Sequence, residues 1–171
     1  AYQTSLWDWD SLFTDIALRQ LFSYNGMETD IFEYEMGCIL NFLVNGEENG
    51  RLPIFITPTR IYPSSKNQHT NTHKPVLAQH IAFISENTDK GYSWIAPYFE
   101  KVERFIEYYD TECKHPCGLY FWLDDGAQGV DNDPCNFYRQ PKSCGSILLN
   151  SLMYQELLAM KKISVALGFA D

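Results

Sequence analysis

A short acidic turn holds the residues whose chemistry is clearest. The stretch GVDNDP places Asp131, Asn132 and Asp133 between a glycine and a proline, just after the aromatic run that ends at Trp122. A carboxyl group held near apolar side chains such as Trp122 and Val130 loses solvation, so its pKa rises and it can donate a proton near neutral pH. The turn therefore favours a general acid.

A simpler structure accounts for the same turn. In an Asx turn, Asp131 or Asp133 bonds its own backbone and needs no ligand. A calcium loop fits poorly, because DNDPCN lacks the glycine and the distal glutamate of an EF-hand. From these residues alone, the general acid and the Asx turn both stay open.

A second group of aromatic and acidic residues lies near the start of the sequence. In LWDWDSLF, Trp9 offers an apolar platform for a sugar ring, and Asp10 can accept hydrogen bonds from sugar hydroxyls. Asp10 can equally cap the helix that is expected there, because a carboxylate accepts the free amides of a first turn.

Composition narrows the class of ligand. The 171-residue chain has a formal charge of -9 and 15% aromatic residues, which argues against nucleic acid and suits a neutral polar ligand such as a sugar. It has no apolar run of about 18 residues and no signal-peptide pattern, so we expect no membrane partner. Because the sequence does not begin with Met, we expect a processed chain or a piece of a larger domain.

The cysteines favour a reducing compartment such as the cytoplasm. There are five, an odd number at irregular spacing, and the chain has no Asn-x-Ser/Thr sequon. A zinc site made from CKHPC with Cys135 and Cys144 has unsuitable intervals. We therefore expect free thiols, and neither a metal nor an organic cofactor.

Helical periodicity, with apolar residues three and four apart, appears in five segments. The pattern predicts helices at residues 10–24, 29–44, 75–86, 97–109 and 145–167. Two predicted apolar faces follow from the same spacing. In the first helix the face is Leu12, Phe13, Ile16, Ala17 and Leu21, and in the fourth it is Tyr98, Val102, Phe105, Ile106 and Tyr109.

The connections between these helices are long. Residues 45–73 are irregular, and only PIFIT within them suits a short strand. No segment alternates with the period of two that a sheet core would show. The prediction is an all-α fold, and the long loops suit a helical toroid better than a bundle, whose connections have about 2–8 residues.

Four stretches occur in a familiar order: TSLWDWDSLF, NTHKPVLAQH, GLYFWLDDGAQGVDNDP and GSILLNSLMYQELLAM. This order resembles that of bacterial relatives of mannosyl-oligosaccharide glucosidase and mannosylglycerate hydrolase, in glycoside hydrolase family sixty-three, with trehalase more distant. The resemblance covers nearly the whole chain. The resemblance implies an (α/α)6 toroid, which is the six-hairpin glycosidase fold. It also implies an enzyme that hydrolyses α-glucosides or α-mannosides with inversion and without a cofactor.

The resemblance also implies roles for single residues. Asp131 matches the general acid of the family, in the motif Gly129-Val130-Asp131. Trp9 and Asp10 match the motif that holds the sugar beside the cleaved bond, and His73-Lys74-Pro75 corresponds to a Q-P-P-like motif that reaches the same sugar. The implied sugar contacts are Trp9, Asp10, Phe13, His73, Lys74, Trp122, Asn132 and Asp133.

The chain departs from the family pattern at two positions. Gln128 stands where the family often has Ser, and His73 where it often has Gln, which changes the groups that could select a substrate. Asp125 and Arg139 lie near enough in sequence to line the same mouth, although charges on loops are usually only solvated.

An inverting glycosidase also needs a base, with its carboxyl ~6.5–9.5 Å from that of the acid. In the family the base is a Glu well downstream of the acid motif, and no Glu here matches it, Glu156 and the Glu47-Glu48 pair included. We therefore expect the N-terminal part of a catalytic domain, inactive alone. Its substrate would be an oligosaccharide or small α-glycoside, and its partner the remainder of the barrel.

Two other functions use the same residues. A carbohydrate-binding or scaffolding module would keep the mouth of the barrel and lose hydrolysis. A helical interaction protein would use the aromatic loops to meet another protein.

Overall fold

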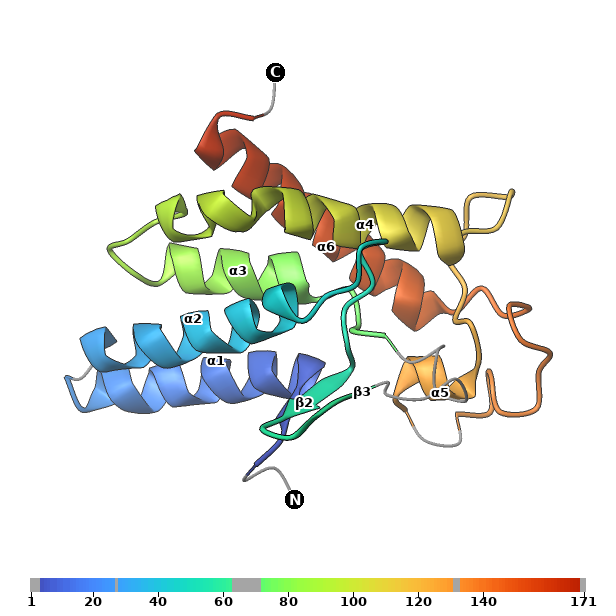
Figure 1. The fold of residues 1–171 in the computed structure, drawn as a ribbon, viewed down its shortest axis with the longest axis horizontal. Coiled ribbons are helices and arrows are strands. Elements are labelled where there is room, and N and C mark those ends of the chain that lie inside the picture. The colour runs from blue at the N-terminus through green and yellow to red at the C-terminus, as the bar shows by residue number, and fades with distance from the viewer. Residues whose placement is uncertain (1–3, 27, 63–71, 131–132, 170–171) are drawn as a thin grey trace.

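The computed structural model describes residues 4–26, 28–62, 72–130 and 133–169, and these are mostly helical, as predicted (Figure 1). Five longer α-helices and one short α-helix occur in the described part of the chain. They are α1 (Asp8–Tyr24), α2 (Glu28–Val44), α3 (Leu77–Glu86), α4 (Phe99–Glu112), α5 (Asp125–Gln128) and α6 (Ile147–Leu167). A 3-10 helix, η2 (Ser93–Tyr98), precedes α4.

The predicted helix starts differ from the observed ones by a few residues. α1 begins at Asp8, so Asp10 lies in its first turn and the N-cap position belongs to Trp7, which makes no side-chain cap. α3 begins at Leu77 rather than Pro75, because the amide of Val76 bonds the carbonyl of Lys74 in a separate turn. The segment with Pro97 is 3-10, and α4 starts after it.

A small antiparallel sheet lies beside the start of α1. Its strands are β1 (Leu6–Trp7), β2 (Phe55–Thr57) and β3 (Arg60–Tyr62), in the order β1-β2-β3. β2 confirms the strand expected within PIFIT, with Leu6 opposite Ile56. β1 and β3 were not predicted, because strands of two or three residues are too short to show alternation.

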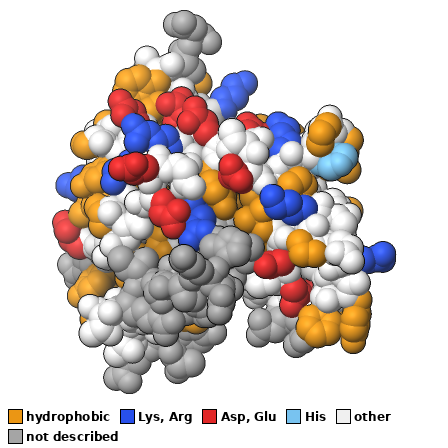
Figure 2. All heavy atoms as spheres, turned by 45° about the vertical axis from the view of Figure 1, so that its right-hand side comes forward, with side chains coloured by type: hydrophobic (Ala, Val, Ile, Leu, Met, Phe, Trp, Pro, Cys, Tyr) orange, Lys and Arg blue, Asp and Glu red, His pale blue; other side chains and the backbone are white. Residues whose placement is uncertain are grey.

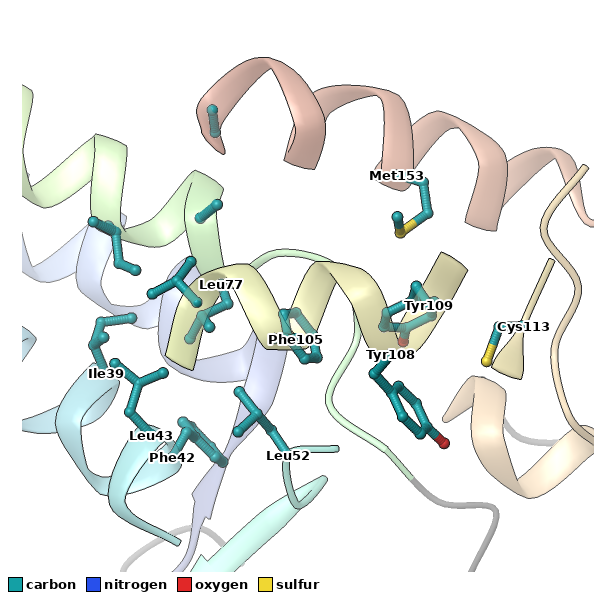
Figure 3. Close-up of a cluster of buried hydrophobic side chains, with 14 of the residues drawn as sticks. Ile39, Phe42, Leu43, Leu52, Leu77, Phe105, Tyr108, Tyr109, Cys113 and Met153 are labelled. Atoms are coloured by element: carbon teal, nitrogen blue, oxygen red, sulfur yellow. The ribbon is translucent and has the colours of Figure 1, made fainter. Parts of the chain in front are cut away.

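The helices pack around α3. α1 and α2 contact each other, and α3 contacts α2 and α6 (Figure 1). The core lies where α4 meets this layer, with Phe42, Leu77, Phe105, Tyr109 and Met153 all buried (Figure 3). The predicted apolar face of α4 is confirmed: Val102, Phe105, Ile106 and Tyr109 are buried and Tyr98 is half-buried.

The predicted apolar face of α1 is wrong except for Leu12. Phe13 is 61% exposed, Leu21 is 59% exposed, and Ile16 and Ala17 are also exposed. The buried face is polar, and each of its charged side chains has a partner of opposite charge or a hydrogen-bonding histidine on another element. It consists of Asp8, Ser11, Leu12, Asp15 and Arg19.

Two further findings concern the distribution of charge and the hydrophobicity of the helices. On the face drawn in Figure 2, Lys and Arg side chains of the described residues are interspersed with Asp and Glu, and do not form the basic stripe that nucleic acid requires. Within the described residues, no helix is both long and apolar enough to cross a membrane.

Candidate functional site

A buried ion pair joins the start of α1 to the segment before α3. Lys74 Nζ lies 2.9 Å from Asp8 Oδ2, and the backbone amide of Lys74 donates to the same oxygen at 2.8 Å. Both side chains are almost fully enclosed, with exposed fractions of 1% and 0%. Asp8 therefore fixes both the charge and the backbone of Lys74, and removing either partner would leave an uncompensated buried charge.

The ammonium of Lys74 also meets two motifs that the sequence places far apart. It lies 5.1 Å from the ring centroid of Trp9, within the range of a cation–π interaction. On the other side, a Cβ built on Gly129 would lie 2.7 Å from Lys74 Cε and closer still to Nζ. Gly129, with φ of 71°, is thus needed both for its backbone conformation and for its lack of a side chain. We call Asp8, Trp9, Lys74 and Gly129 the Lys74 site.

His73 supports this site from inside the core. Its Nδ1 donates to the carbonyl of Lys74 at 2.6 Å, and its ring contacts Phe42 and Phe105 edge to face. Burial lowers the pKa of His73 to about 4, so the ring is neutral near pH 7. Tyr109 donates to the carbonyl of His73 at 2.7 Å. His73 is fully enclosed, so it acts here through the Lys74 backbone.

In the acidic turn, Asp133 accepts hydrogen bonds from residues before and after it in the sequence. Gln128 is buried, donates to Asp133 and accepts from Asn136. Asp133 also accepts from the amide of Cys135 at 2.9 Å, which is the geometry of an Asx turn. These bonds lower the pKa of Asp133, so it accepts hydrogen bonds and is unsuited to donating a proton. Asp131 and Asn132 lie outside the described residues.

Asp10 and Phe13 lie on other sides of α1 than the Lys74 site. Asp10 lines a cavity of about 260 Å³ between β1, α1 and α2, together with Trp7, Ser11, Asp15 and Cys38. Successive residues of an α-helix point about 100° apart, so Trp9 and Asp10 diverge. Phe13 belongs to the exposed apolar face of α1.

Three residues near the acidic turn have separate environments. Trp122 is buried in the core, and its Nε1 has no hydrogen-bond partner within the described part of the chain. Asp125 lies in the first turn of α5 and is half-buried, whereas Arg139 is exposed. Asp124 caps α5 by accepting from the amide of Ala127 at 2.9 Å. The cap fixes the direction in which the chain enters Gly129.

Glu156 has neighbours that the sequence did not reveal. It is fully buried on α6 and accepts from the amides of Ala78 and Gln79, at 2.7 Å and 3.2 Å, at the start of α3. Burial raises the pKa of Glu156 to about 7, although the bonds from the amides lower it. Glu156 is fully enclosed and bonded to these amides, so it is poorly placed to activate a water as the missing base.

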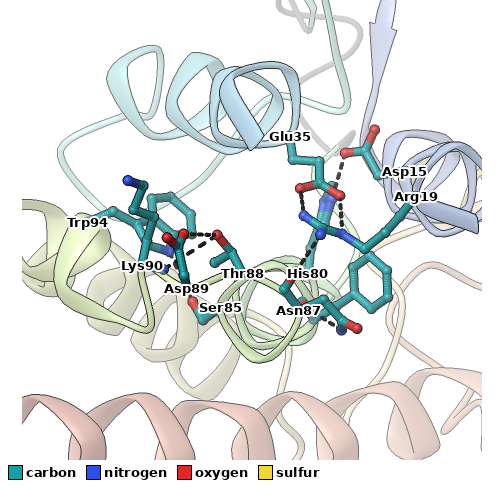
Figure 4. A network of polar contacts seen from close by, with 11 residues as sticks. Asp15, Arg19, Glu35, His80, Ser85, Asn87, Thr88, Asp89, Lys90 and Trp94 are labelled. Atoms are coloured by element: carbon teal, nitrogen blue, oxygen red, sulfur yellow. Dashed lines mark hydrogen bonds and ion pairs between the residues drawn. The ribbon is translucent and has the colours of Figure 1, made fainter. Parts of the chain in front are cut away.

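A second set of buried charges lies further along α1 (Figure 4). Arg19 forms a two-pronged ion pair with Glu35 of α2 and also donates to the carbonyl of Asn87. Asp15 accepts from His80 Nε2 of α3 at 2.8 Å. We call these residues the Arg19 cluster. It links α1, α2 and α3 through side chains and lies among helices rather than loops.

Sequence reasoning missed Asp8 and Glu156 for different reasons. The sequence does contain a signal for the buried face of α1, because its polar residues follow helical spacing together with Leu12. These residues are Asp8, Asp15 and Arg19. Glu156 stands in an ordinary helical sequence, and nothing in its neighbours along the chain points to the distant start of α3.

The described residues contain no group of three or more His, Cys, Asp and Glu side chains that could hold a metal ion. All five cysteines are free thiols, of which Cys113 is buried and Cys117 and Cys135 are exposed. In comparisons with known proteins, no family model matches the chain, and neither a curated protein nor a solved structure matches it.

Proposed function

We propose that this chain carries the general acid and part of the sugar subsite of an inverting α-glycosidase that acts on α-linked glucosides or mannosides. The supporting observation is the Lys74 site. It joins the aromatic-acidic start, the His73-Lys74-Pro75 segment and Gly129 of the acidic turn through contacts at Trp9 and Asp8. They belong to three of the four stretches on which the resemblance to glycoside hydrolases rests.

In this proposal Asp131 protonates the oxygen of the cleaved glycosidic bond. Trp9 is half-buried, so part of its ring is available to stack on a pyranose face. Lys74 is enclosed, and its part is to hold Trp9 and Gly129 in place. The base is a glutamate outside this sequence, since Glu156 is committed to the amides of α3. The reaction uses no metal and no organic cofactor.

The toroid and its missing part belong to the same proposal. The outward faces of α1 and α6 carry large exposed apolar side chains. Exposed apolar areas of this kind mark surfaces that are covered by a partner. We propose that the remainder of the barrel, as a further segment or a second chain, packs on these faces. The side chains are Phe13, Ile16 and Leu21 on α1, and Ile147, Tyr154, Leu158 and Val165 on α6.

The test is hydrolysis of a panel of α-glucosides and α-mannosides by the longest form of the protein, beside the same form with Asp131→Asn. A general acid contributes about 10²–10⁴-fold to the rate, so we expect the variant to lose at least about 100-fold in turnover with sugar affinity kept. Equal activity of the two forms would contradict the assignment.

A second function is favoured by one observation. Glu156, whose pKa burial raises to about 7, is enclosed and bonded to the amides of Ala78 and Gln79, so it does not supply the base. A carbohydrate-binding module of the same fold would need Trp9 and no base. Sugar binding by the longest form without turnover on any substrate would support this function.

A further inference from the structure

Glu156 connects α6 to the first turn of α3. Its Oε1 accepts from the amide of Ala78 at 2.7 Å, and its Oε2 accepts from the amide of Gln79 at 3.2 Å and from Gln79 Nε2 at 3.3 Å. First-turn amides have no partner within their own helix, so a carboxylate at this place completes the start of α3. It comes from a side chain 77 positions away from Gln79 in sequence.

The same turn continues the segment that carries Lys74. Gln79 Nε2 also donates to the carbonyl of Pro75 at 2.8 Å and to that of Leu152, on α6, at 3.2 Å. The amide of Val76 donates to the carbonyl of Lys74 at 2.7 Å. Glu156 is therefore connected to Lys74 by hydrogen bonds to Gln79 and from Gln79 to Pro75, by the peptide bond from Pro75 to Val76, and by the hydrogen bond from Val76 to Lys74.

Other elements hold the segment at its opposite end. Asp8 of α1 bonds the amide and the ammonium of Lys74, and Tyr109 of α4 bonds the carbonyl of His73. The amide of His73 donates to the carbonyl of Leu52 at 3.0 Å. Glu156 is thus the member of this set whose carboxylate holds the start of α3 directly.

The groups that hold Glu156 are amides, which carry no net charge. Among the described residues, no Lys, Arg or His side chain forms an ion pair with Glu156. Tyr109 is the titratable group of α4 that feels its charge, and burial first, with several nearby charges, raises the pKa of Tyr109 well above its usual range. In the segment before α3, His73 is neutral near pH 7, and the charge of Lys74 is paired with Asp8. On α6 itself, Lys162 pairs with Glu86 at the far end of α3.

We infer that Glu156 is a positioning residue for the Lys74 site, and that its ionisation state sets how firmly the His73-Lys74-Pro75 segment is held. The carboxylate accepts from both amides at once. A protonated carboxyl keeps one good acceptor oxygen and must find an acceptor for its own proton, so one of the bonds to α3 is lost. Proton uptake near neutral pH would loosen the first turn of α3 and the segment before it.

The first test needs no sugar. The amide ¹H and ¹⁵N shifts of Ala78 and Gln79, and the side-chain ¹³Cδ shift of Glu156, are followed from about pH 5.5 to about pH 8.5, a range that brackets the transition. We expect all of them to titrate together, with a midpoint near the Glu156 pKa of about 7. Amide shifts without an inflection, or a Glu156 carbon that shows no titration within this range, would overturn the inference.

Two variants make the assignment specific. Glu156→Gln should abolish the inflection at Ala78 and Gln79. Glu86→Gln is the matched control at the other end of α3, where the carboxylate is exposed and bonded to Lys162, and it should leave the inflection unchanged. If Glu156→Gln does not fold, the ¹³Cδ titration of the unmodified protein still decides the question.

The second test concerns the sugar site and depends on the proposed function. The dissociation constant of methyl α-glucoside or methyl α-mannoside, measured with the longest form, should be at least about threefold weaker at about pH 5.5 than at about pH 8. Glu86→Gln should keep this dependence. If a sugar binds with the same affinity throughout, Glu156 does not position the site. If neither sugar binds at any pH, the proposed function fails, while the titration of Ala78 and Gln79 still tests Glu156.

Discussion

The Lys74 site and the Arg19 cluster are two buried groups of charges on the same face of α1, and they hold different kinds of structure. The Arg19 cluster joins side chains in the middle of α1 and α2 and reaches the carbonyl of Asn87 beyond α3. The Lys74 site instead joins the first turn of α1 to a backbone amide and to a glycine of the acidic turn. One group sets the packing of helices, and the other sets the position of loops.

Changes in these two groups should affect different properties of the protein. Burying ions costs free energy that well-made pairs repay only in part, and we infer that each of these two groups serves to fix one geometry. At the Arg19 cluster this geometry is the register of three helices. At the Lys74 site it is the placement of Trp9 and Gly129. Damage to the first should lower stability alone, whereas damage to the second should also weaken sugar binding.

The largest expected effect is on stability at the Arg19 cluster. Arg19→Met leaves Glu35, which is fully enclosed, without its partner, and removing one member of a buried pair costs about 3–5 kcal/mol. We expect this loss in the free energy of unfolding, measured with urea, with no change in the sugar affinity of the folded protein. The exposed pair Arg104–Glu100 is the control, where Arg104→Met should cost at most about 1 kcal/mol.

The double variant Arg19→Met with Glu35→Leu sharpens this result. Because it removes both charges, it should be more stable than Arg19→Met alone. A weaker sugar affinity in the folded form of either variant would remove the distinction between the two groups.

An intermediate effect is expected at Gly129. Ala at this φ of 71° costs about 1–2 kcal/mol in backbone conformation, and its Cβ would displace Lys74. We expect Gly129→Ala to lower both stability and sugar affinity. Gly168→Ala is the matched control, because Gly168 also ends a helix, with φ of 75°, and has nothing within 4 Å of an added Cβ. Gly168→Ala should lower stability by the backbone cost only and should keep the sugar affinity. An equal loss of sugar affinity in the two variants would rule out a role for the contact between Gly129 and Lys74.

The last expected effect is a pH dependence of stability at His73. Its pKa is lowered from 6.5 to about 4 by burial, so the unfolded chain binds more protons than the folded one between these values. The stability that the neutral ring contributes is present above pH 6.5 and is lost as the pH falls toward about 4. Relative to His73→Gln, the unmodified protein should lose at most about 1.4 kcal/mol per pH unit in this window. A difference that does not change with pH would show that His73 is not buried as described.

The sequence predicted the helical class and most helix positions because apolar spacing and glycine stops are local signals. α4 shows this best, since Val102, Phe105 and Tyr109 are buried as expected. It failed at α1, where the partners of Asp8, Asp15 and Arg19 come from distant segments. Because of these three pairings, α1 buries its polar face, whereas hydrophobicity alone would bury the apolar one. The pairings are visible only in the folded chain.

The candidate site was predictable in part. The sequence indicated Trp9, Lys74 and the glycine of the acidic turn, and these lie together. It also grouped Asp10 with Trp9, whereas Asp8 is the carboxylate that reaches Lys74. Asp8 and Asp10 point in different directions because each residue of a helix is rotated from the next. Which of them reaches Lys74 therefore depends on where α1 begins, and the sequence predicted this start two residues too late.

The proposed function requires that Trp9, held in place by the enclosed Lys74, provides the surface on which a sugar binds. The most direct measurement is the indole ¹H–¹⁵N spectrum of the longest form during titration with methyl α-glucoside and methyl α-mannoside. The four tryptophans serve as internal references for each other. The account predicts that one of these sugars shifts the Trp9 signal most, and that Lys74→Met weakens this response while Arg19→Met leaves it unchanged. No shift at Trp9 with either sugar, or an equal response in both variants, would contradict it.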